Sequence, residues 1–291
     1  MASGNTTTSA LTDSLPTVIA EARIIREQEG VMPQLVDKQT LGEGIGLDWN
    51  EVSYAALTAS AVNETTILDN PQQFSDTLLT ITPTMVGIET LITDRVARRI
   101  TKKGYAKMGG LAQNAIQRKK DQDGLTVLDS ATTSLCGAGT TLTSGYITAA
   151  VTRISSNATE PGVKPFRCVL HGYQIKDIFD ELISGVGTYP ITDGVTARVF
   201  QSGFAMPIAG CEIYEDGNIT IDSSDDAKGG VFAKDGIILV QGKSPWTETL
   251  RRPNIGGGAT SVYHYDEYAY GERSSGNWLY EIYSDATAPT S

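Results

Sequence analysis

The stretch DRVARRITKKGYAKMGGLAQNAIQRKK, residues 94–120, decides the fold because its apolar residues repeat at helical spacing over a greater length than elsewhere in the chain. Residues three or four apart share one side of an α-helix, so the stretch predicts a long helix. Thr93 or Asp94 is expected to cap its first turn. At about 1.5 Å per residue the helix would be about 40 Å long. The predicted apolar stripe consists of Val96, Ile100, Gly104, Met108, Leu111 and Ala115.

The same stretch concentrates positive charge. It holds nine of the 23 Lys and Arg residues and one acid, so its net charge is +8 in a chain whose net charge is −11, and the remainder carries −19. The simplest interpretation is a solvated face of a packed helix. The alternative is a basic face that meets nucleic acid or acidic segments of the same kind of chain. The candidates for such a face are Arg95, Arg99, Lys103, Arg118, Lys119 and Lys120.

Composition excludes several classes of protein. A chain of 291 residues with 40% hydrophobic residues is long enough to bury a substantial core. No apolar run approaches the ~20 residues that cross a bilayer, and the N-terminus does not read as a signal peptide, so we expect no membrane association. A pI of 4.7 argues against a sequence-reading DNA-binding protein. The three cysteines are few and far apart, which predicts free thiols.

Strand patterns precede the helix. Residues 45–57 alternate imperfectly, and residues 73–92 indicate a returning strand with a break at Pro83, so together they predict a long antiparallel hairpin. Two strands alone are not stable in water, so we expect this hairpin to lie on a neighbouring molecule. The candidates for that contact are Trp49, Glu51, Tyr54 and Phe74. Residues 1–44 indicate a polar arm that contains a short helix at 15–29.

The chain after the helix predicts a separate lobe of strands and helices. Residues 124–145 indicate a connector of small residues, and a short helix is expected to begin at Ser144. A buried strand in PFRCVLHGYQ is followed by a helix in IKDIFDELIS, a strand at 211–214, and a pair of short strands around Lys234-Asp235-Gly236. Residues 246–291 are aromatic and alternate as strands, with Trp246, Trp278 and Tyr280 in structural roles. Arg251 and Arg252 are expected to contact carboxylates across a subunit boundary.

Catalytic and ligand-binding patterns are weak. The only histidines are His171 and His264, and no G-x-S-x-G elbow supplies a serine nucleophile. Alternating Asp216, Asn218, Thr220 and Asp222 lack the placement of an EF-hand and predict a plain turn. We therefore expect no catalytic residue, no cofactor and no metal, and a chain that is not an enzyme.

The order of these features carries a resemblance to a known family. The sequences LLTITPTMVGIETLITD, PFRCVLHGYQIKDIFDEL, PIAGCEIYEDGNI, GGVFAKDGIILVQGKSPWTETLRRP and YGERSSGNWLYEIYSDA occur in sequence around the long helix. Taken together, this order resembles the major capsid proteins of tailed phages, which have the Hong-Kong-97-type fold. Encapsulin nanocompartments share that fold and form the nearest alternative. An α/β enzyme using His171 and a carbohydrate-binding β protein are alternatives from other classes.

The resemblance implies an α+β fold with four parts. These are an N-terminal arm at 1–44, an extended hairpin loop at 45–92, a peripheral domain with a spine helix at 93–140 and 246–275, and an axial domain at 141–245 and 276–291. It implies a subunit that assembles with itself, as hexamers and pentamers, into an icosahedral shell around double-stranded DNA that is contacted non-specifically. Scaffolding, portal and decoration proteins would be further partners. The location would be the virion, and the host cytoplasm during assembly.

Overall fold

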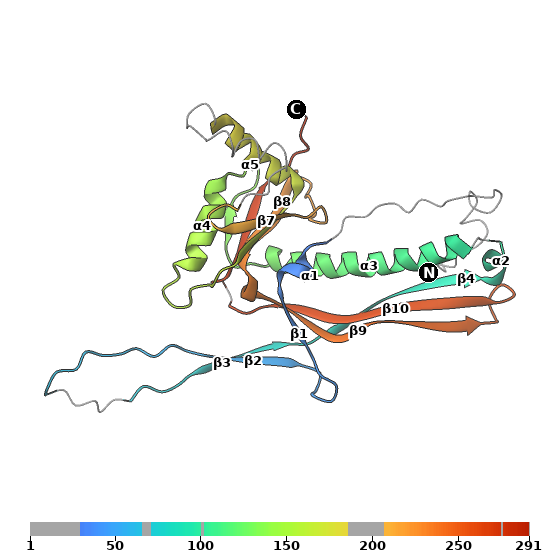
Figure 1. Cartoon of the computed structure of the whole chain (residues 1–291), viewed down its shortest axis with the longest axis horizontal. Coiled ribbons are helices and arrows are strands. Elements are labelled where there is room, and N and C mark those ends of the chain that lie inside the picture. Colours follow the sequence, from blue (N-terminus) through green and yellow to red (C-terminus); the bar gives the residue numbers. More distant parts are fainter. Residues whose placement is uncertain (1–29, 66–70, 100–101, 186–206, 275, 291) are drawn as a thin grey trace.

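The computed structural model describes residues 30–65, 71–99, 102–185, 207–274 and 276–290, with the backbone alone at 102–108 and 182–185. It confirms a mixed α+β architecture. Figure 1 shows two sheets that meet near one end of the long helix α3, with a thin hairpin projecting from the opposite side of the body. The predicted helix at 15–29 lies outside the described residues.

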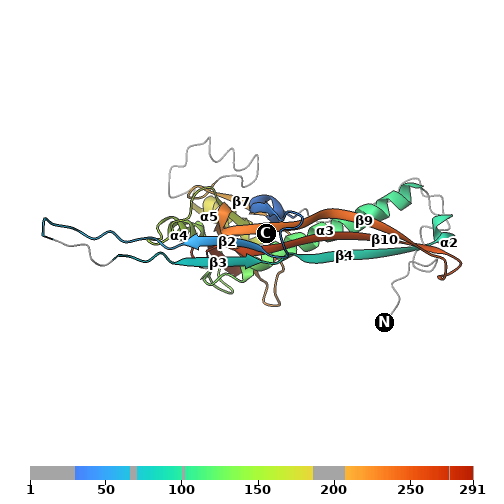
Figure 2. The same cartoon turned by 90° about the horizontal axis from the view of Figure 1, so that it is seen from below.

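The first sheet has four strands in the order β1-β9-β10-β4. The turn between its two longest strands contains Gly256, Gly257 and Gly258, all at positive φ, where glycine is favoured. Strand β1 runs parallel to β9, and the other neighbours are antiparallel. Figure 2 shows this sheet from below as a long, narrow layer. Its strands are β1 (Asp37–Thr40), β4 (Thr84–Thr93), β9 (Ile237–Arg252) and β10 (Ala259–Glu272).

The second sheet has five strands in the order β5-β11-β8-β6-β7. The structure confirms four predicted elements of this lobe, namely the strands β6 and β7 and the helices α4 and α5. One face of this sheet packs a core that includes Ile147, Ile154, Phe166 and Ile178. The elements are β5 (Ser134–Cys136), α4 (Ser144–Ser155), β6 (Phe166–Leu170), α5 (Gly172–Gly185), β7 (Cys211–Glu215), β8 (Asp226–Ala233) and β11 (Leu279–Asp285).

The long helix is confirmed, with different bounds. A short helix α2 (Asp94–Ala97) precedes α3 (Lys102–Asp129), and α3 continues through GLTVLD, which had been expected to be a connector. Leu125 and Leu128 are buried in these last turns because both sheets meet there. The predicted stripe is also offset, since Ala112 and Ile116 are buried whereas Leu111 is 39% exposed.

The projecting hairpin is confirmed but shorter than predicted. Strands β2 (Trp49–Tyr54) and β3 (Asp76–Ile81) pair only with each other. After Pro83 the chain enters β4, which pairs with β10 along its whole length, so residues 84–93 belong to the four-stranded sheet.

Two further segments lie in other sheets than expected. Strands β8 and β9 had been expected to pair around Lys234-Asp235-Gly236, but that segment forms a 3-10 turn that carries the chain from one sheet to the other. Strand β9 therefore begins the four-stranded sheet at Ile237, and β5 joins the five-stranded sheet beside β11. The short helix α1 (Met32–Leu35) and β1, from the predicted arm, pack on this body.

Shortening Leu128 tests the observed bounds of α3. We expect Leu128→Ala to lower the free energy of unfolding by about 2–5 kcal/mol, because the side chain is fully buried. The control Leu111→Ala, on the same helix, should cost less than about 1 kcal/mol. Denaturant unfolding measures both. Equal losses would contradict this register of the helix.

Candidate interaction surfaces

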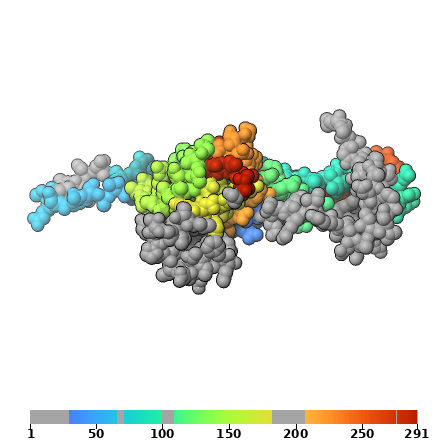
Figure 3. All heavy atoms as spheres, turned by 90° about the horizontal axis from the view of Figure 1, so that it is seen from above, coloured from blue at the N-terminus to red at the C-terminus, as the bar shows by residue number. Residues whose placement is uncertain are grey.

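The hairpin exposes apolar side chains that the chain itself does not cover. Among the described residues, eight of the twelve exposed large apolar side chains lie between residues 45 and 78. Figure 3 shows the hairpin, in light blue, projecting from the body. Contiguous exposed apolar surface on a soluble protein commonly marks an interaction site. The eight residues are Ile45, Leu47, Val52, Tyr54, Leu57, Val62, Phe74 and Leu78.

The two faces of the hairpin differ. Directly paired residues in an antiparallel ladder lie on the same face, and successive pairs alternate between faces. Val52 pairs with Leu78, and Tyr54 lies two residues further along the same face. All three are exposed, by 45%, 60% and 74% in the order Val52, Leu78, Tyr54. We call these three residues the apolar face of the hairpin.

The opposite face is anchored at its base to the same chain. Trp49 and Ile81 pack with Ile238 of β9. Glu51 accepts a hydrogen bond from Nε of Arg273 at 2.7 Å. Of the four predicted contact residues, the structure therefore turns Trp49 and Glu51 towards their own chain, while Tyr54 and Phe74 are exposed. Their contact with a neighbouring copy stays a prediction.

Arg251 and Arg252 lie at the end of the four-stranded sheet that is next to α2. Both terminal nitrogens of Arg251 bind the carboxylate of Asp94 at 2.5 Å, which lowers the pKa of that carboxyl. Arg252 lies 3.0 Å from Glu89 and also bonds the hydroxyl of Tyr263. Both arginines thus have partners within their own chain, because the β9–β10 turn lies against α2 and β4. The predicted contacts across a subunit boundary stay a prediction.

The residues of the predicted basic face differ in exposure, and their role inside a shell stays a prediction. Arg95, Arg99, Arg118 and Lys119 are exposed, and Lys119 bonds Asp123 one turn later. The side chain of Lys103 lies outside the described residues. The inclusion of Lys120 was wrong. That residue is only 6% exposed, because its position on α3 points towards β10 rather than towards solvent.

Lys120 instead centres a buried polar network. Its Nζ lies 3.1 Å from Oδ2 of Asp266, which is fully buried, and 4.7 Å from the centre of the Tyr268 ring. Gln241 of β9 bonds both Lys120 and Asp266. The hydroxyl of Tyr268 donates to Asp123 at 2.8 Å. Burial raises the pKa of Tyr268, so this hydroxyl stays protonated as a donor. The network joins α3 to two strands of the four-stranded sheet.

The aromatic side chains of the C-terminal part are packed. Tyr280 is buried and Trp278 packs beside it in the core of the five-stranded sheet, where the indole N–H donates to the carbonyl of Glu160 at 2.9 Å. The Trp246 ring packs against Tyr265 at a tilt of 32°, with ring centres 5.2 Å apart, and Nζ of Lys243 lies 4.0 Å from the centre of the Trp246 ring. These contacts agree with the predicted structural role.

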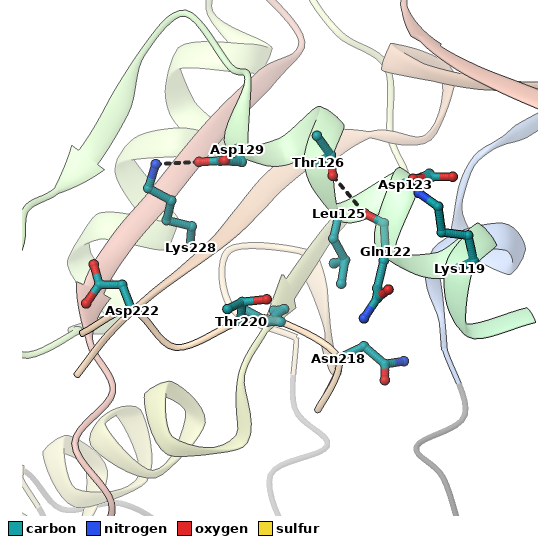
Figure 4. A pocket seen from close by; sticks show the side chains of 11 residues that line it. Lys119, Gln122, Asp123, Leu125, Thr126, Asp129, Asn218, Thr220, Asp222 and Lys228 are labelled. Carbon is teal, nitrogen blue, oxygen red and sulfur yellow. Dashed lines mark hydrogen bonds and ion pairs between the residues drawn. The ribbon is translucent and has the colours of Figure 1, made fainter. Parts of the chain in front are cut away.

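A cleft of about 560 Å³ lies between α3 and the loop that follows β7 (Figure 4). Two of its cations are paired with carboxylates, Lys119 with Asp123 and Lys228 with Asp129. Neither histidine nor cysteine lines it. Its lining is Lys119, Gln122, Asp123, Leu125, Thr126, Asp129, Asn218, Ile219, Thr220, Asp222 and Lys228.

The two histidines lie outside this cleft. Nδ1 of His171 accepts the N–H of Tyr173 at 3.2 Å at the start of α5, and burial lowers its pKa. Nδ1 of His264 lies 3.1 Å from the hydroxyl of Thr247. Within the described part of the chain, no three acidic, thiol or imidazole side chains gather as a metal site would require. In the same part, no helix is both long enough and apolar enough to cross a membrane.

Solved phage structures share this architecture. A chain of Mycobacterium phage Che8 is 15% identical, with a TM-score of 0.73 over 96% of this chain and 100% of that one. A chain of the cyanophage Pam1 capsid is 11% identical, with a TM-score of 0.72 over 99% of this chain and 100% of that one. A chain of the cyanophage P-SCSP1u capsid is 13% identical, with a TM-score of 0.69 over 97% and 96%. The fold is that of phage capsid chains.

This capsid fold spans nearly the whole chain, so the hairpin, both sheets and α3 all lie within the matched region. The sequence matches no family model and no curated protein. At identities of 11–15% the likeness establishes the architecture, and the apolar face of the hairpin and the basic residues must be interpreted from this chain's own geometry.

Removing the Lys120 amine tests the buried network. We expect Lys120→Ala to lower the free energy of unfolding by about 3–5 kcal/mol, because Asp266 would be left buried and unpaired. The matched control Lys119→Ala breaks an exposed pair and should cost about 0.5 kcal/mol or less. Denaturant unfolding at neutral pH compares the two. A small loss at Lys120, similar to that at Lys119, would show that residue 120 is solvated.

Proposed function

We propose that this chain is the major capsid protein of a tailed bacteriophage, a subunit that assembles with itself into an icosahedral shell around double-stranded DNA. The apolar face of the hairpin is the observation that carries the proposal. Val52, Tyr54 and Leu78 lie on two strands that, among the described strands, pair only with each other. Beyond its anchored base, such a ribbon gains stability by lying on another surface. In a shell of identical subunits, each hairpin can lie on its neighbour. The likeness to phage capsid folds supports such an assembly.

Charge supports a contact between opposite ends of two copies. Residues 45–82 contain five acids and no Lys or Arg. Exposed Arg95, Arg98 and Arg99 lie on and after α2, which is at the other end of the elongated molecule (Figure 1). A contact between different surfaces of identical subunits repeats around a ring. Opposite charges on the two surfaces favour this pairing over contacts between like ends.

The remaining assignments follow from the same proposal. The four-stranded sheet with α2 and α3 is the peripheral domain, and the five-stranded sheet with α4 and α5 is the axial domain of hexamers and pentamers. Of the predicted arm at 1–44, α1 and β1 belong to the body, so the proposed arm is the chain before α1. Scaffolding, portal and decoration proteins are proposed partners, and assembly takes place in the host cytoplasm. Arg118 and Lys119 would face negative charge inside the shell, and we favour the acidic arm over the genome as their main partner. Arg95 and Arg99, also predicted for that face, would instead meet the acidic hairpin of a neighbouring copy.

Electron microscopy and sedimentation of the expressed protein test the function. We expect closed shells of uniform diameter, alone or with the phage's scaffolding protein. A protein that stays monomeric under both conditions would contradict the proposal. Shells that enclose protein cargo and no DNA in the infected cell would instead support the encapsulin alternative.

A charge placed on the apolar face tests the proposed contact. We expect Leu78→Asp to abolish assembly while leaving the melting temperature of the single subunit almost unchanged, because Leu78 is exposed in the subunit but would be buried between subunits. The control Thr77→Asp puts the same charge on the opposite face of the same strand. Shell yield is measured by sedimentation. Equal yields from the two variants would locate the contact elsewhere.

A further inference from the structure

Two aspartates from distant parts of the chain are buried together where the described chain begins. Asp121 of α3 is fully buried and Asp216, which follows β7, is 1% exposed. Oδ1 of Asp121 accepts the N–H of Met32 at 3.0 Å, and Oδ2 of Asp216 accepts the N–H of Val31 at 3.4 Å. Two successive backbone amides are thus held by two different parts of the body.

Asn218 links the two carboxyl groups. Its side-chain amide donates to Oδ2 of Asp121 at 2.9 Å, and its backbone N–H donates to Oδ1 of Asp216 at 2.9 Å. Both carboxyl groups are buried and gathered around the same Asn218. Two neighbouring carboxylates removed from water repel each other when both are ionised, which favours a proton on one of them.

Among the described residues, no cation neutralises the pair. In the part of the chain that the structure describes, neither aspartate forms an ion pair with Lys or Arg. The charged groups of the surrounding elements are engaged elsewhere. On α3, Lys119 binds Asp123 and Lys120 binds Asp266 of β10. Lys228 of β8 binds Asp129, and Arg167 of β6 donates to the carbonyl of Leu35.

The remaining titratable neighbours do not supply positive charge. Tyr268 and Tyr270 of β10 are neutral because burial raises the pKa of each hydroxyl. His171 and Glu215 lie beside the loop that carries Asp216, and burial lowers the pKa of His171, which favours its neutral form. Residues 31–36 contain no titratable side chain.

The backbone at Gly30 packs directly against the carboxyl group of Asp121. A Cβ atom on Gly30 would lie 2.2 Å from Cγ of Asp121, so only glycine fits there. Repulsion within the pair is therefore relieved most directly by lifting residues 30–32.

We propose that Asp121 and Asp216 share one proton and act as a latch, which holds residues 30–32 to α3 and to the loop after β7 while the proton is present and releases them when it leaves. The latch joins residues 30–32 to α3 and to the five-stranded sheet, so its opening would release this segment from the body. This inference concerns the single chain and does not depend on the proposed shell.

The direction of the pH effect follows from the buried carboxyl. Burial, and then the charge of Asp121, raise the pKa of Asp216 from 3.8 to about 7, against the hydrogen bond from Asn218. In the closed state Asp216 keeps its proton up to about pH 7, whereas in the open state it loses the proton at its ordinary pKa of 3.8. Closure is therefore favoured fully below about pH 4, weakens as pH rises to about 7, and changes no further above it.

Hydrogen exchange of the full-length chain tests the latch. The protection of the Val31 and Met32 amides, corrected for the exchange rate of an unstructured peptide, should fall about fiftyfold between pH 5 and pH 7. The opening constant changes about tenfold per pH unit well below the pKa of about 7 and less steeply near it. Protection of residues 166–170, in buried β6, should not show this fall.

Two variants and one control complete the test. Asp216→Asn removes one charge while keeping an acceptor and a donor, so protection at Val31 and Met32 should become independent of pH. Asp121→Asn removes the neighbouring charge but leaves Asp216 buried, so the fall in protection should persist and move to lower pH. The control Asp225→Asn changes an exposed acid on the same loop at positive φ, which Asn tolerates, and should keep the parent's pH profile. A parent without pH dependence, or an Asp216→Asn variant with the parent's slope, would overturn the proposal.

Discussion

The packing of the second half of α3 is the constraint on which the rest of the structure depends. Leu125 and Leu128 bury their side chains where the four-stranded and five-stranded sheets meet, together with Met32 of α1. Glycines permit this close approach, because a Cβ on Gly124 would lie 2.9 Å from Cβ of Met32 and one on Gly230 would lie 3.1 Å from Cδ2 of Leu128. One helix thereby fixes both sheets and the beginning of the described chain.

The second half of α3 also carries buried polar side chains. Their hydrogen bonds and ion pairs fix the orientation of the helix on the body. Lys120 turns towards Asp266 and Asp121 towards Asn218, so consecutive residues of α3 bind different parts of the body. Buried charges of this kind cost desolvation energy and are retained only where each partner is present. These contacts hold the body together, and the projecting hairpin is the part that leaves apolar side chains exposed. A subunit with a packed body and an exposed apolar hairpin is suited to self-assembly.

Local patterns were enough to predict the elements, and the missed features depend on distant partners. The hairpin, its break at Pro83, β6, α4 and α5 all follow from periodicity and turn residues close together in the chain. The end of α3 was missed because GLTVLD has the composition of a loop and becomes helical only between two sheets. Spacing still offered a signal, since Ile116, Lys120, Gly124 and Leu128 continue one helix face.

The burial of Lys120 could not be predicted from its surroundings in the sequence, because QRKKDQD has the composition of a solvated face and Asp266 lies 146 residues away. The same holds for Arg251, whose partner Asp94 lies 157 residues away. Asp216 and Asn218 were correctly expected in a turn, but their bonds with Asp121 depend on how that turn lies against α3.

The central claim is that the hairpin of one subunit is completed by another, and a cryo-electron-microscopy reconstruction of the assembled protein tests it most directly. The account predicts that Val52, Tyr54 and Leu78 lie within about 4.5 Å of apolar atoms of a neighbouring copy. A reconstruction in which these side chains fold back onto their own subunit, or stay in solvent within a closed shell, would contradict it.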